Sequence, residues 1–481
     1  MRTLQELSLA VPGAQLLRGD AEIASLATDS RIADLSGALF ICIRGTVFDA
    51  HDAAAQVKDK GAAALVVERE LPVDLPQLLV RDCREAWSYL AAAWYDFPAE
   101  KLRLIGVTGT KGKTTTTTLI ARVLEHAGYK VGLMGTVTNE IAGVAYPQHL
   151  TTPDPMEMQA LFARMVEAGC TFAVMEVSAH AAALRKVAGL EYEVMGFTNL
   201  SQDHLNDFHT MENYGAAKAL LFRDNVARVA IVNGDDAFTP TLIAGRTKPT
   251  LLFSLEGRGA IRAEHIASHL SGVSYDLHMG PLAQAMRLRL GGRFNVANSL
   301  LAAGICAQVG LSLKVIAEGL ASVPGVPGRL ERVEVGKDIV VLVDYAHSPD
   351  SLENVLSAVL PETKGEVWAV FGCGGDRDRG KRPIMGEIAE RLAAHVVITT
   401  DNPRTEDPEA IIAEIAGGLK NPAAAHCIPD RTDAIRYALE HAQPGDTVLI
   451  AGKGHETYQE IRGVRHPYDD REVVRSLMPC P

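Results

Sequence analysis

The sequence feature that most limits the possible folds is an apolar run that leads into a glycine-rich turn and then into consecutive threonines. Residues 102–108 are mostly apolar, Gly109 and Gly112 follow, and Lys113 precedes the threonines at 114–118. This order predicts a buried strand, a tight turn and a helix start, because glycine accepts the backbone angles of a tight turn. The stretch therefore indicates an α/β fold with the turn at the end of a sheet strand.

The same stretch predicts a phosphate-binding loop, which we interpret as an ATP site with Mg²⁺ as its ion. Backbone N–H groups and the helix N-terminus attract phosphate oxygens, Lys113 reaches the outer phosphates, and the Thr114 hydroxyl suits Mg²⁺. The usual spacing needs glycine at position 107, which is valine, while Gly106 comes one residue early. A glycine-rich turn followed by a helix cap is the simpler alternative. The expected ATP contacts are Gly109, Thr110, Lys111, Gly112, Lys113, Thr114 and Thr115.

The composition narrows the class of protein. A chain of 481 residues suggests roughly three domains, and 47% hydrophobic with 22% charged residues is ordinary for a globular protein. The net charge of −12 argues against nucleic acid as the main partner. The seven scattered cysteines contain no Cys-x-x-Cys pair, which fits a reducing compartment and no zinc site. Residues 1–25 do not resemble a signal peptide, and no run is long enough to span a bilayer. We expect a monomeric cytoplasmic protein that acts on small molecules, without a membrane partner.

Apolar runs divide the chain into three α/β stretches. In the first, residues 37–43 and 63–68 are predicted strands and residues 85–94 a helix. The runs in the second hardly alternate, as expected for parallel strands covered on both faces: 102–108, 172–177, 193–198 and 227–232. The third contains the runs 339–344, 367–372, 395–399 and 447–452. Pro98 and two Pro-Gly turns within 323–329 mark the boundaries, so we expect domains at 1–98, 99–322 and 323–481.

Polar residues follow the strands of the second stretch, where the chemistry of a parallel sheet is expected. Glu176 ends one strand, with Ser178 and His180 directly after it, and Asp203 and His204 follow another. A carboxylate is a preferred ligand of Mg²⁺, so Glu176 is the candidate beside Thr114, with a solvated strand end as the alternative. His204 by itself is more typical of a surface or packed histidine.

Lys218 has apolar neighbours on nearly every side of its segment, residues 214–222. A lysine held there is desolvated, its pKa falls, and a neutral amine results. From composition alone we favour the alternative, a side chain whose stem lies along the helix and whose ammonium reaches water.

In the third stretch, three strand ends carry Arg, Asn and Glu. These are the basic segment 372–383, residues 401–408 and residues 452–456. Guanidinium groups suit a carboxylate and carboxylates suit an ammonium, so together they indicate a pocket for a small zwitterion, although each alone is typical of a polar turn. Asp344 follows a fourth strand, either as a ligand-binding residue or as a helix cap.

Taken together, Gly109-Thr-Lys-Gly-Lys-Thr114, Glu176-Val-Ser178, Asn199-Leu-Ser-Gln-Asp-His204, Asp344-Tyr-Ala-His347 and Ala451-Gly-Lys-Gly-His-Glu456 closely resemble the Mur ligases of peptidoglycan synthesis. The resemblance covers almost the whole chain. It implies a UDP-binding N-terminal domain, a central P-loop-type ATPase domain with a mostly parallel sheet, and a Rossmann-like C-terminal domain that binds the amino acid. Asp401-Asn-Pro-Arg404 is similar to the motif form associated with meso-2,6-diaminopimelate rather than L-lysine.

The resemblance also implies roles residue by residue. Catalytic roles go to Lys113, Lys218, Glu176 and His204; the Mg²⁺ ligands are Thr114, Glu176, His204 and Lys218, the lysine in carbamylated form. ATP also contacts Asn295, Arg329 and Asp344. The UDP-muramoyl-dipeptide is held by Ser30, Thr151, Thr152, Ser178 and Lys186. Diaminopimelate is held by Arg377, Asn402, Arg404, Gly452 and Glu456.

Three positions depart from the family pattern. Lys186 stands where the family commonly has arginine, so the positive charge is kept but the bidentate hydrogen bonding of a guanidinium is lost. Leu184 stands where the family often has glutamine. Asn206 stands where aspartate is usual, and the His-Gly that often follows is missing.

The activity that the resemblance implies is ATP-dependent ligation of meso-2,6-diaminopimelate to the D-Glu of UDP-N-acetylmuramoyl-L-Ala-D-Glu through an acyl phosphate. An L-lysine-adding or folylpolyglutamate-type ligase is the nearest alternative; Arg404 argues against the first and Asp29-Ser-Arg31 against the second. Two alternatives belong to other classes of protein. A P-loop NTPase module without ligase activity would leave Glu456 and the third domain without a role. A nucleotide-binding regulator that lacks catalysis is the other alternative.

Overall fold

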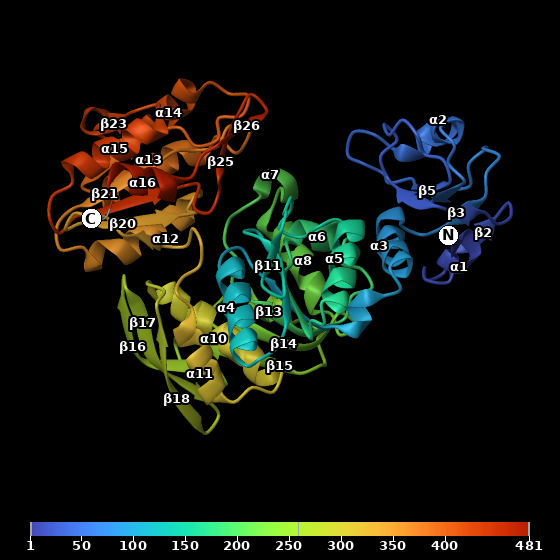
Figure 1. The fold of residues 1–481 in the computed structure, drawn as a ribbon, viewed down its shortest axis with the longest axis horizontal. Coiled ribbons are helices and arrows are strands. Elements are labelled where there is room, and N and C mark those ends of the chain that lie inside the picture. Colours follow the sequence, from blue (N-terminus) through green and yellow to red (C-terminus); the bar gives the residue numbers. More distant parts are fainter. Residues whose placement is uncertain (1, 258, 480–481) are drawn as a thin grey trace.

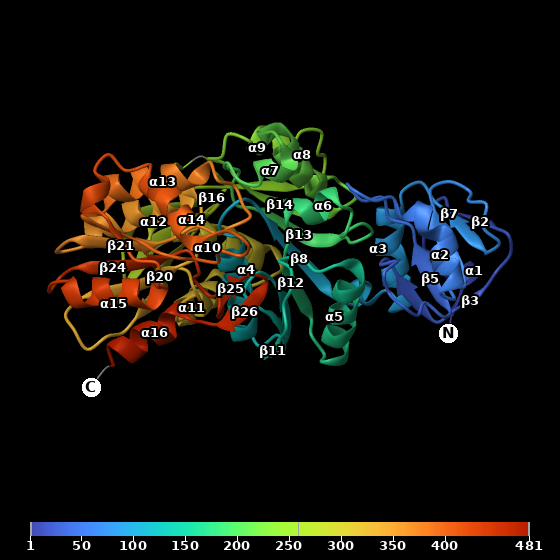
Figure 2. The same cartoon turned by 90° about the horizontal axis from the view of Figure 1, so that it is seen from above.

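Three α/β units follow one another along the chain in a computed structural model, which describes residues 2–257 and 259–479 (Figure 1). The middle unit lies between the other two (Figure 2). Each of the three larger sheets takes its strands from one stretch of the chain. The α/β fold class predicted from the sequence is confirmed.

The first unit contains a five-stranded sheet of order β2-β7-β6-β5-β4, in which β4 to β7 are parallel and β2 is antiparallel. Buried side chains lie on both faces of this sheet, for example Ile41 on one and Phe40 on the other. The expected strands and helix are present as β5, β6 and α3. Its elements are β1 Arg2–Thr3, α1 Leu4–Ser8, β2 Gln15–Leu17, β3 Glu22–Ile23, β4 Ser25–Ala27, β5 Ala38–Ile41, α2 Ala54–Asp59, β6 Ala64–Val67, β7 Gln77–Leu79 and α3 Cys83–Trp94.

The second unit is organised around β8, the strand that ends at the glycine-rich loop. It lies between β12 and β13 in an eleven-stranded sheet of order β11-β10-β9-β12-β8-β13-β14-β15-β16-β17-β18, and its neighbours on both sides are parallel to it. Helix α4 begins at Lys113, as the threonine run predicts. The elements up to α8 are β8 Arg103–Thr108, α4 Lys113–His126, β9 Val131–Met134, β10 Asn139–Ile141, β11 Val144–Tyr146, α5 Pro155–Glu167, β12 Phe172–Glu176, α6 Ala179–Ala183, β13 Tyr192–Phe197, α7 Leu205–Phe208 and α8 Met211–Ala219.

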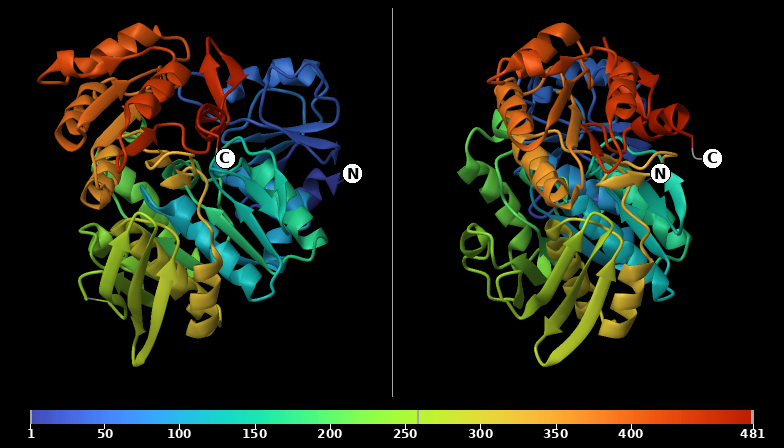
Figure 3. Two further views of the ribbon diagram at one scale, coloured as in Figure 1. Left: turned by 60° about the vertical axis from the view of Figure 1, so that its left-hand side comes forward. Right: turned by 90° about the vertical axis from the view of Figure 1, so that its left-hand side faces the viewer.

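The second unit ends in an antiparallel arm that the sequence analysis did not predict. Strands β16, β17 and β18 pair antiparallel, and the arm projects from the side away from the first unit (Figures 1 and 3). In β17, the buried residues Val273, Tyr275 and Leu277 alternate with more exposed ones and pack in the same core cluster as α10 and α11. This alternation with a period of two is typical of a strand that is covered on one face. The elements are β14 Ala227–Asn233, α9 Thr239–Leu242, β15 Thr250–Ser254, β16 Ile261–His269, β17 Gly272–Met279, β18 Leu282–Leu288, α10 Arg293–Gln308 and α11 Leu313–Ser322.

The third unit has a six-stranded sheet of order β19-β20-β24-β21-β22-β23, parallel except for β19. The four apolar runs expected here are β20, β21, β22 and β24, and helix α12 begins at Pro349. The elements are β19 Glu331–Val333, β20 Val340–Asp344, α12 Pro349–Val359, β21 Val367–Phe371, α13 Lys381–Leu392, β22 His395–Ile398, α14 Pro408–Ala416, β23 His426–Cys427, α15 Arg431–His441, β24 Thr447–Ala451, β25 Tyr458–Ile461, β26 Val464–Pro467 and α16 Asp470–Leu477.

Hydrogen bonds tie the units together near the glycine-rich loop. Lys111 Nζ donates to Ser348 Oγ of the third unit at 2.9 Å, and Arg329 Nη2 lies 3.2 Å from Thr114 Oγ1. On the other side, Ser88 Oγ of α3 donates to the carbonyl oxygen of Arg185 at 2.7 Å. The carboxyl ends of strands β8 and β20 therefore face one another across a narrow space.

Two sequence-based expectations concern the whole chain. The six cysteines within the described residues carry free thiols, whereas Cys480 lies outside that part of the chain. Among the described residues, no helix combines the length and the apolar character that crossing a membrane requires.

Candidate active site

The glycine-rich loop has room for glycine alone at two positions. Gly109 has φ +148°, and a Cβ there would lie 1.8 Å from Thr198 Oγ1. Gly112 has φ +83°, and its Cβ would lie 2.3 Å from Asn298 Oδ1. Any side chain would displace the loop, so the backbone lies close to the next strand and to α10. Gly106, by contrast, belongs to β8 and packs against Met195, which makes it a packing glycine of the strand.

Lys113 and Lys111 point in different directions from this loop. Lys113 Nζ donates to the carbonyl oxygens of Gly109 and Thr110 at 2.8 and 3.0 Å, and burial lowers its pKa. Lys111 Nζ lies 3.1 Å from Asp203 Oδ2 as well as near Ser348. Burial opposes ionisation of Asp203, but Lys111, His204 and His347 together favour the charged form and lower the pKa of that carboxyl.

A cavity of about 480 Å³ opens beside the loop, between the second and third units. Its walls include the loop, Asn298 and Phe294 on α10, Arg329, and the segment from Asp344 to Val355 that follows β20. It offers backbone N–H groups at one end and aromatic and amide side chains along its walls. Those are the contacts that a nucleotide requires.

Of the three outlying ATP residues that the resemblance implied, Arg329 and Asp344 line this cavity. Asp344 is buried, which raises its pKa, and it accepts hydrogen bonds from the backbone N–H groups of Leu330 and Ala346. It is therefore not the cap of α12, whose N-cap is Ser348. Asn295 lies behind Asn298, whose Nδ2 donates a hydrogen bond to Asn295 Oδ1 at 3.0 Å. Among the described residues that line the cavity, the asparagine of this pair is Asn298.

Glu176 ends β12 in a buried position, and Thr136 holds both of its carboxylate oxygens. The backbone N–H of Thr136 donates to Oε1 at 2.8 Å and its hydroxyl donates to Oε2 at 2.9 Å. The alternative of a solvated strand end is thus wrong for Glu176, which is 1% exposed. Thr136 was not predicted, because it lies in a loop after β9 without a motif of its own.

Lys218 is enclosed, so the interpretation favoured from composition, a lysine reaching water, is wrong. Only 1% of the residue is exposed, and its ammonium lies 4.4 Å from the centre of the Tyr214 ring. Burial and the nearby charge of Lys113 hold the pKa of Lys218 well below its ordinary range. The surroundings therefore disfavour the charged form of the Lys218 amine.

His204 lies at the start of the short helix α7 with φ +56°. Its Nε2 lies 3.9 Å from Asp203 Oδ2, and its ring packs edge-on against His180 with 5.0 Å between the ring centroids. Burial lowers the pKa of His204 despite the opposing charge of Asp203. Its imidazole is thus neutral and able to bind a cation.

Three of the residues expected to hold the dipeptide, Thr151, Thr152 and Ser178, lie next to Glu176 or to Thr136. Thr152 Oγ1 donates to the Glu176 carbonyl oxygen at 3.0 Å, and Thr151 Oγ1 lies 3.1 Å from the Thr136 hydroxyl. Ser178 caps α6 and accepts from Ala181 N, while Lys186 Nζ lies 2.6 Å from Asp154 Oδ1. Ser30 is separate from this group: it lies after β4 in the first unit, where Lys60 Nζ donates to its carbonyl oxygen at 2.7 Å.

The three strand ends of the third unit do meet. Asn402, after β22, donates from Nδ2 to Glu456 Oε2 at 2.8 Å, and Glu456 follows β24. Burial raises the pKa of Glu456. Lys453, which was not predicted, is fully buried beneath both and donates to Asn402 Oδ1 at 2.9 Å. Its position in the Gly-Lys-Gly-His-Glu motif is the signal that was available in the sequence.

The guanidinium groups of this pocket differ in exposure. Arg404 Nη1 donates to the Gly375 carbonyl oxygen at 2.7 Å, and its Nε lies 3.6 Å from Glu460 Oε2, whereas Arg377 is exposed. Gly452 has φ +116°, and a Cβ there would lie 2.4 Å from Asp401 Oδ2. Arg382 of the basic segment is not available to a ligand, because it is buried between Glu406 and Glu414.

Two models of protein families match the chain. The Mur ligase middle domain matches residues 107–306, and the Mur ligase, glutamate ligase domain matches residues 328–454. The first match covers the glycine-rich loop, Glu176 and Lys218. The second covers the strand ends at 372–383 and 401–408 and stops at residue 454, two residues before Glu456.

Individual proteins are similar along nearly the whole chain. A Geobacillus kaustophilus protein named UDP-N-acetylmuramoyl-L-alanyl-D-glutamate--2,6-diaminopimelate ligase is 44% identical over 468 residues, which is 96% of each chain. A Syntrophomonas wolfei protein of that name is 42% identical over 95% of each chain. A solved structure of a protein with that name aligns with a TM-score of 0.69 at 36% identity, covering 95% of this chain and 94% of the other. On this evidence the chain belongs to the Mur ligase family.

Proposed function

We propose that the chain is an ATP-dependent amide ligase that joins meso-2,6-diaminopimelate to the D-Glu of UDP-N-acetylmuramoyl-L-Ala-D-Glu in the cytoplasm. One observation carries this proposal. The imidazole of His455 lies beside the backbone of Thr136, whose N–H and hydroxyl hold Glu176, and Glu456 follows in the pocket with Asn402. An amino-acid pocket and a phosphate loop thus share one boundary, as a two-step ligation requires. The names of the relatives support the choice of substrates.

The three units have separate tasks in this proposal, with boundaries after residues 98 and 322. Residues 1–98, with Ser30, hold the UDP moiety; residues 99–322 bind ATP; and residues 323–481 bind the amino acid. The match of one family model within 107–306 and of another within 328–454 supports the second boundary. In the third unit, Arg377 and Arg404 face the carboxylate of diaminopimelate, and Glu456, which Asn402 orients, faces its ammonium group.

The residues present fit a magnesium ion. Glu176 retains free lone pairs beyond the two hydrogen bonds from Thr136, and the Thr114 hydroxyl offers a neutral oxygen. His204 is neutral, and the lowered pKa of Lys218 suits reaction of its amine with CO₂, which releases a proton and forms a carbamate with anionic oxygens. Thr114, Glu176, His204 and carbamylated Lys218 are therefore the proposed ligands. When bound, Mg²⁺ neutralises charge on the phosphates.

The reaction proceeds in two displacements. The D-Glu carboxylate oxygen attacks the γ-phosphorus of ATP, the bond to the β-phosphate oxygen breaks, and ADP leaves; Lys113 stabilises the charge that develops. The neutral amine of diaminopimelate then attacks the acyl-phosphate carbonyl, phosphate leaves with the bonding electron pair, and the nitrogen loses a proton. Contact between the second and third units excludes water, which would otherwise hydrolyse the acyl phosphate.

The decisive experiment measures phosphate release with ATP, Mg²⁺ and the UDP-muramoyl-dipeptide, comparing meso-diaminopimelate, L-lysine and no amino acid. We expect release, and a tripeptide product by mass spectrometry, with diaminopimelate alone. A product with L-lysine would overturn the reading of residues 401–404. Equal release without any amino acid would overturn the ligase proposal in favour of a nucleoside triphosphatase.

A further inference from the structure

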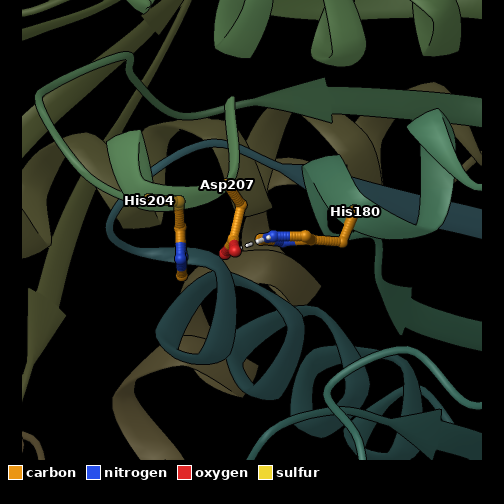
Figure 4. A group of neighbouring side chains, drawn as sticks. All are labelled: His180, His204 and Asp207. Atoms are coloured by element: carbon orange, nitrogen blue, oxygen red, sulfur yellow. Dashed lines mark hydrogen bonds and ion pairs between the residues drawn. The ribbon is translucent and has the colours of Figure 1, made fainter. Parts of the chain in front are cut away.

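His180, His204 and Asp207 form a cluster that the proposed ligase chemistry does not use as a group (Figure 4). One ligand atom from each residue lies within 4.8 Å of the other two. His180 comes from α6, whereas His204 and Asp207 come from the start and the interior of α7. The three side chains are 37%, 48% and 50% exposed, so an ion has access to them from solvent.

We propose that these three side chains form a binding site for a transition-metal dication of the zinc type. Two imidazole nitrogens and one carboxylate oxygen are a ligand set typical of Zn²⁺, Co²⁺ or Ni²⁺ with water completing the coordination. Mg²⁺, in contrast, prefers oxygen ligands alone. The site is therefore chemically distinct from the magnesium site proposed above, although His204 belongs to both.

The geometry suits such an ion. His180 Nε2 and Asp207 Oδ2 are 3.0 Å apart, close to the roughly 3.3 Å between two ligand atoms of a tetrahedral ion with ligand distances near 2.0 Å. Figure 4 shows the Asp207 carboxylate directed at the His180 ring, with the His204 ring on its other side. Asp203 Oδ2 lies 3.9 Å from His204 Nε2, too far for a hydrogen bond but near enough to add negative charge beside the cluster.

The site has a consequence for catalysis that rests on the proposed function. An ion held by His180, His204 and Asp207 draws His204 away from the magnesium site and slows ligation. His180 and Asp207 have no other assigned role, so changing either one separates the two sites. The exposed pair His265 and Asp276, with 2.9 Å between Nδ1 and Oδ2, is a matched control because it lacks a third ligand among the described residues.

The test titrates the full-length protein, free of any metal-binding tag, with Co²⁺ and follows its visible absorption. We expect one Co²⁺ per chain in the wild type and in H265Q, and affinity at least about tenfold weaker in both D207N and H180Q. A wild type without this site, or equal affinity in all four proteins, would overturn the proposal.

The catalytic consequence has its own measurement, which is phosphate release at saturating Mg²⁺ with increasing Zn²⁺. We expect half-inhibition of D207N at a Zn²⁺ concentration about tenfold higher than for the wild type. If D207N binds Co²⁺ more weakly but is inhibited by the same Zn²⁺ concentration as the wild type, the proposed role of His204 in inhibition is refuted. Failure of the ligase proposal itself would appear as missing activity without Zn²⁺, while the Co²⁺ titration alone decides whether the metal site exists.

Discussion

The ammonium group of Lys453 donates to Asn402 Oδ1 at 2.9 Å and so fixes the direction of the Asn402 amide. The same oxygen accepts a hydrogen bond from the backbone N–H of Glu460. With Oδ1 held on both sides, Nδ2 is directed at Glu456, 2.8 Å away. Lys453 therefore positions Asn402 and, through it, Glu456, the side chain that we propose faces the amino-acid substrate.

Replacing Lys453 by methionine should weaken binding of diaminopimelate. The change removes a buried, charged hydrogen-bond donor worth about 2 kcal/mol, which corresponds to a rise of roughly 30-fold in KM for the amino acid. KM for ATP should stay the same, because the nucleotide cavity is lined by other residues. Steady-state kinetics with each substrate varied in turn measures both constants. The exposed Lys420→Met change is the control, and equal rises in both KM values would show general damage to the fold.

Gly109→Ala should abolish nucleotide binding, because the added methyl group would lie 1.8 Å from Thr198 Oγ1. Gly128→Ala is the matched control: Gly128 also has a positive φ, +90°, but has open space around its Cβ position. Both changes should lower stability by about 1–2 kcal/mol from backbone strain alone. Calorimetric titration with an ATP analogue distinguishes them, and normal binding by Gly109→Ala would disprove the close packing of the loop.

Lys218→Ala should reduce turnover by roughly 100-fold or more, because it removes the amine that we propose becomes a carbamate. Short carboxylic acids should restore part of the activity of this variant by supplying the missing carboxylate. They should not restore Lys113→Ala, where a cation is lost. Rescue of both variants, or of neither, would speak against a carbamate at Lys218.

Glu406→Gln should destabilise the protein near neutral pH and have little effect in acid. The hydrogen bond from Arg382 lowers the pKa of Glu406 from 4.5 to about 2. The carboxylate therefore contributes stability that is fully present above pH 4.5 and is lost as the pH falls toward 2. Thermal unfolding of wild type and variant across this range should give midpoints that converge in acid. Exposed Glu409→Gln serves as the control, and a gap that stays constant with pH would contradict the ion pair.

Ligand binding should make the protein more compact in solution. The two Pro-Gly turns within residues 323–329 connect the second and third units, and the contact of Lys111 with Ser348 lies across the cavity where ATP is proposed to bind. X-ray scattering with an ATP analogue and the UDP-muramoyl-dipeptide should therefore show a smaller radius of gyration than the unliganded protein. Superimposable curves would contradict domain closure.

Much of the fold could be predicted because a covered parallel strand has a simple signature. The runs at 172–177, 367–372 and 447–452 became β12, β21 and β24 with ends shifted by one residue. The antiparallel arm β16–β18 escaped prediction because its apolar residues alternate with polar ones and carry no motif. The signal was present as a period of two, which predicts a strand with one covered face.

The site was predicted where chemistry and local sequence coincide, as at Lys113 and Glu176. It was missed where a role arises from contacts over a long distance in sequence. Thr136 reaches Glu176 across 40 positions, and Lys453 reaches Asn402 across 51. Asn298 replaces Asn295 at the cavity because the two lie one helical turn apart, so that sequence alone does not decide which amide faces inward. Burial of Lys218 likewise depends on how α8 packs.

Thr136 contacts Glu176, Thr151 and the third unit's His455. A ligand that shifts this threonine at one of these sites changes the free energy of binding at the others. Thermodynamic linkage makes such an effect reciprocal: if the ion at Glu176 strengthens binding of the dipeptide by some factor, the dipeptide strengthens binding of the ion by the same factor. Because this one residue lies between the three sites, we expect the affinity for each substrate to depend on which of the others is already bound.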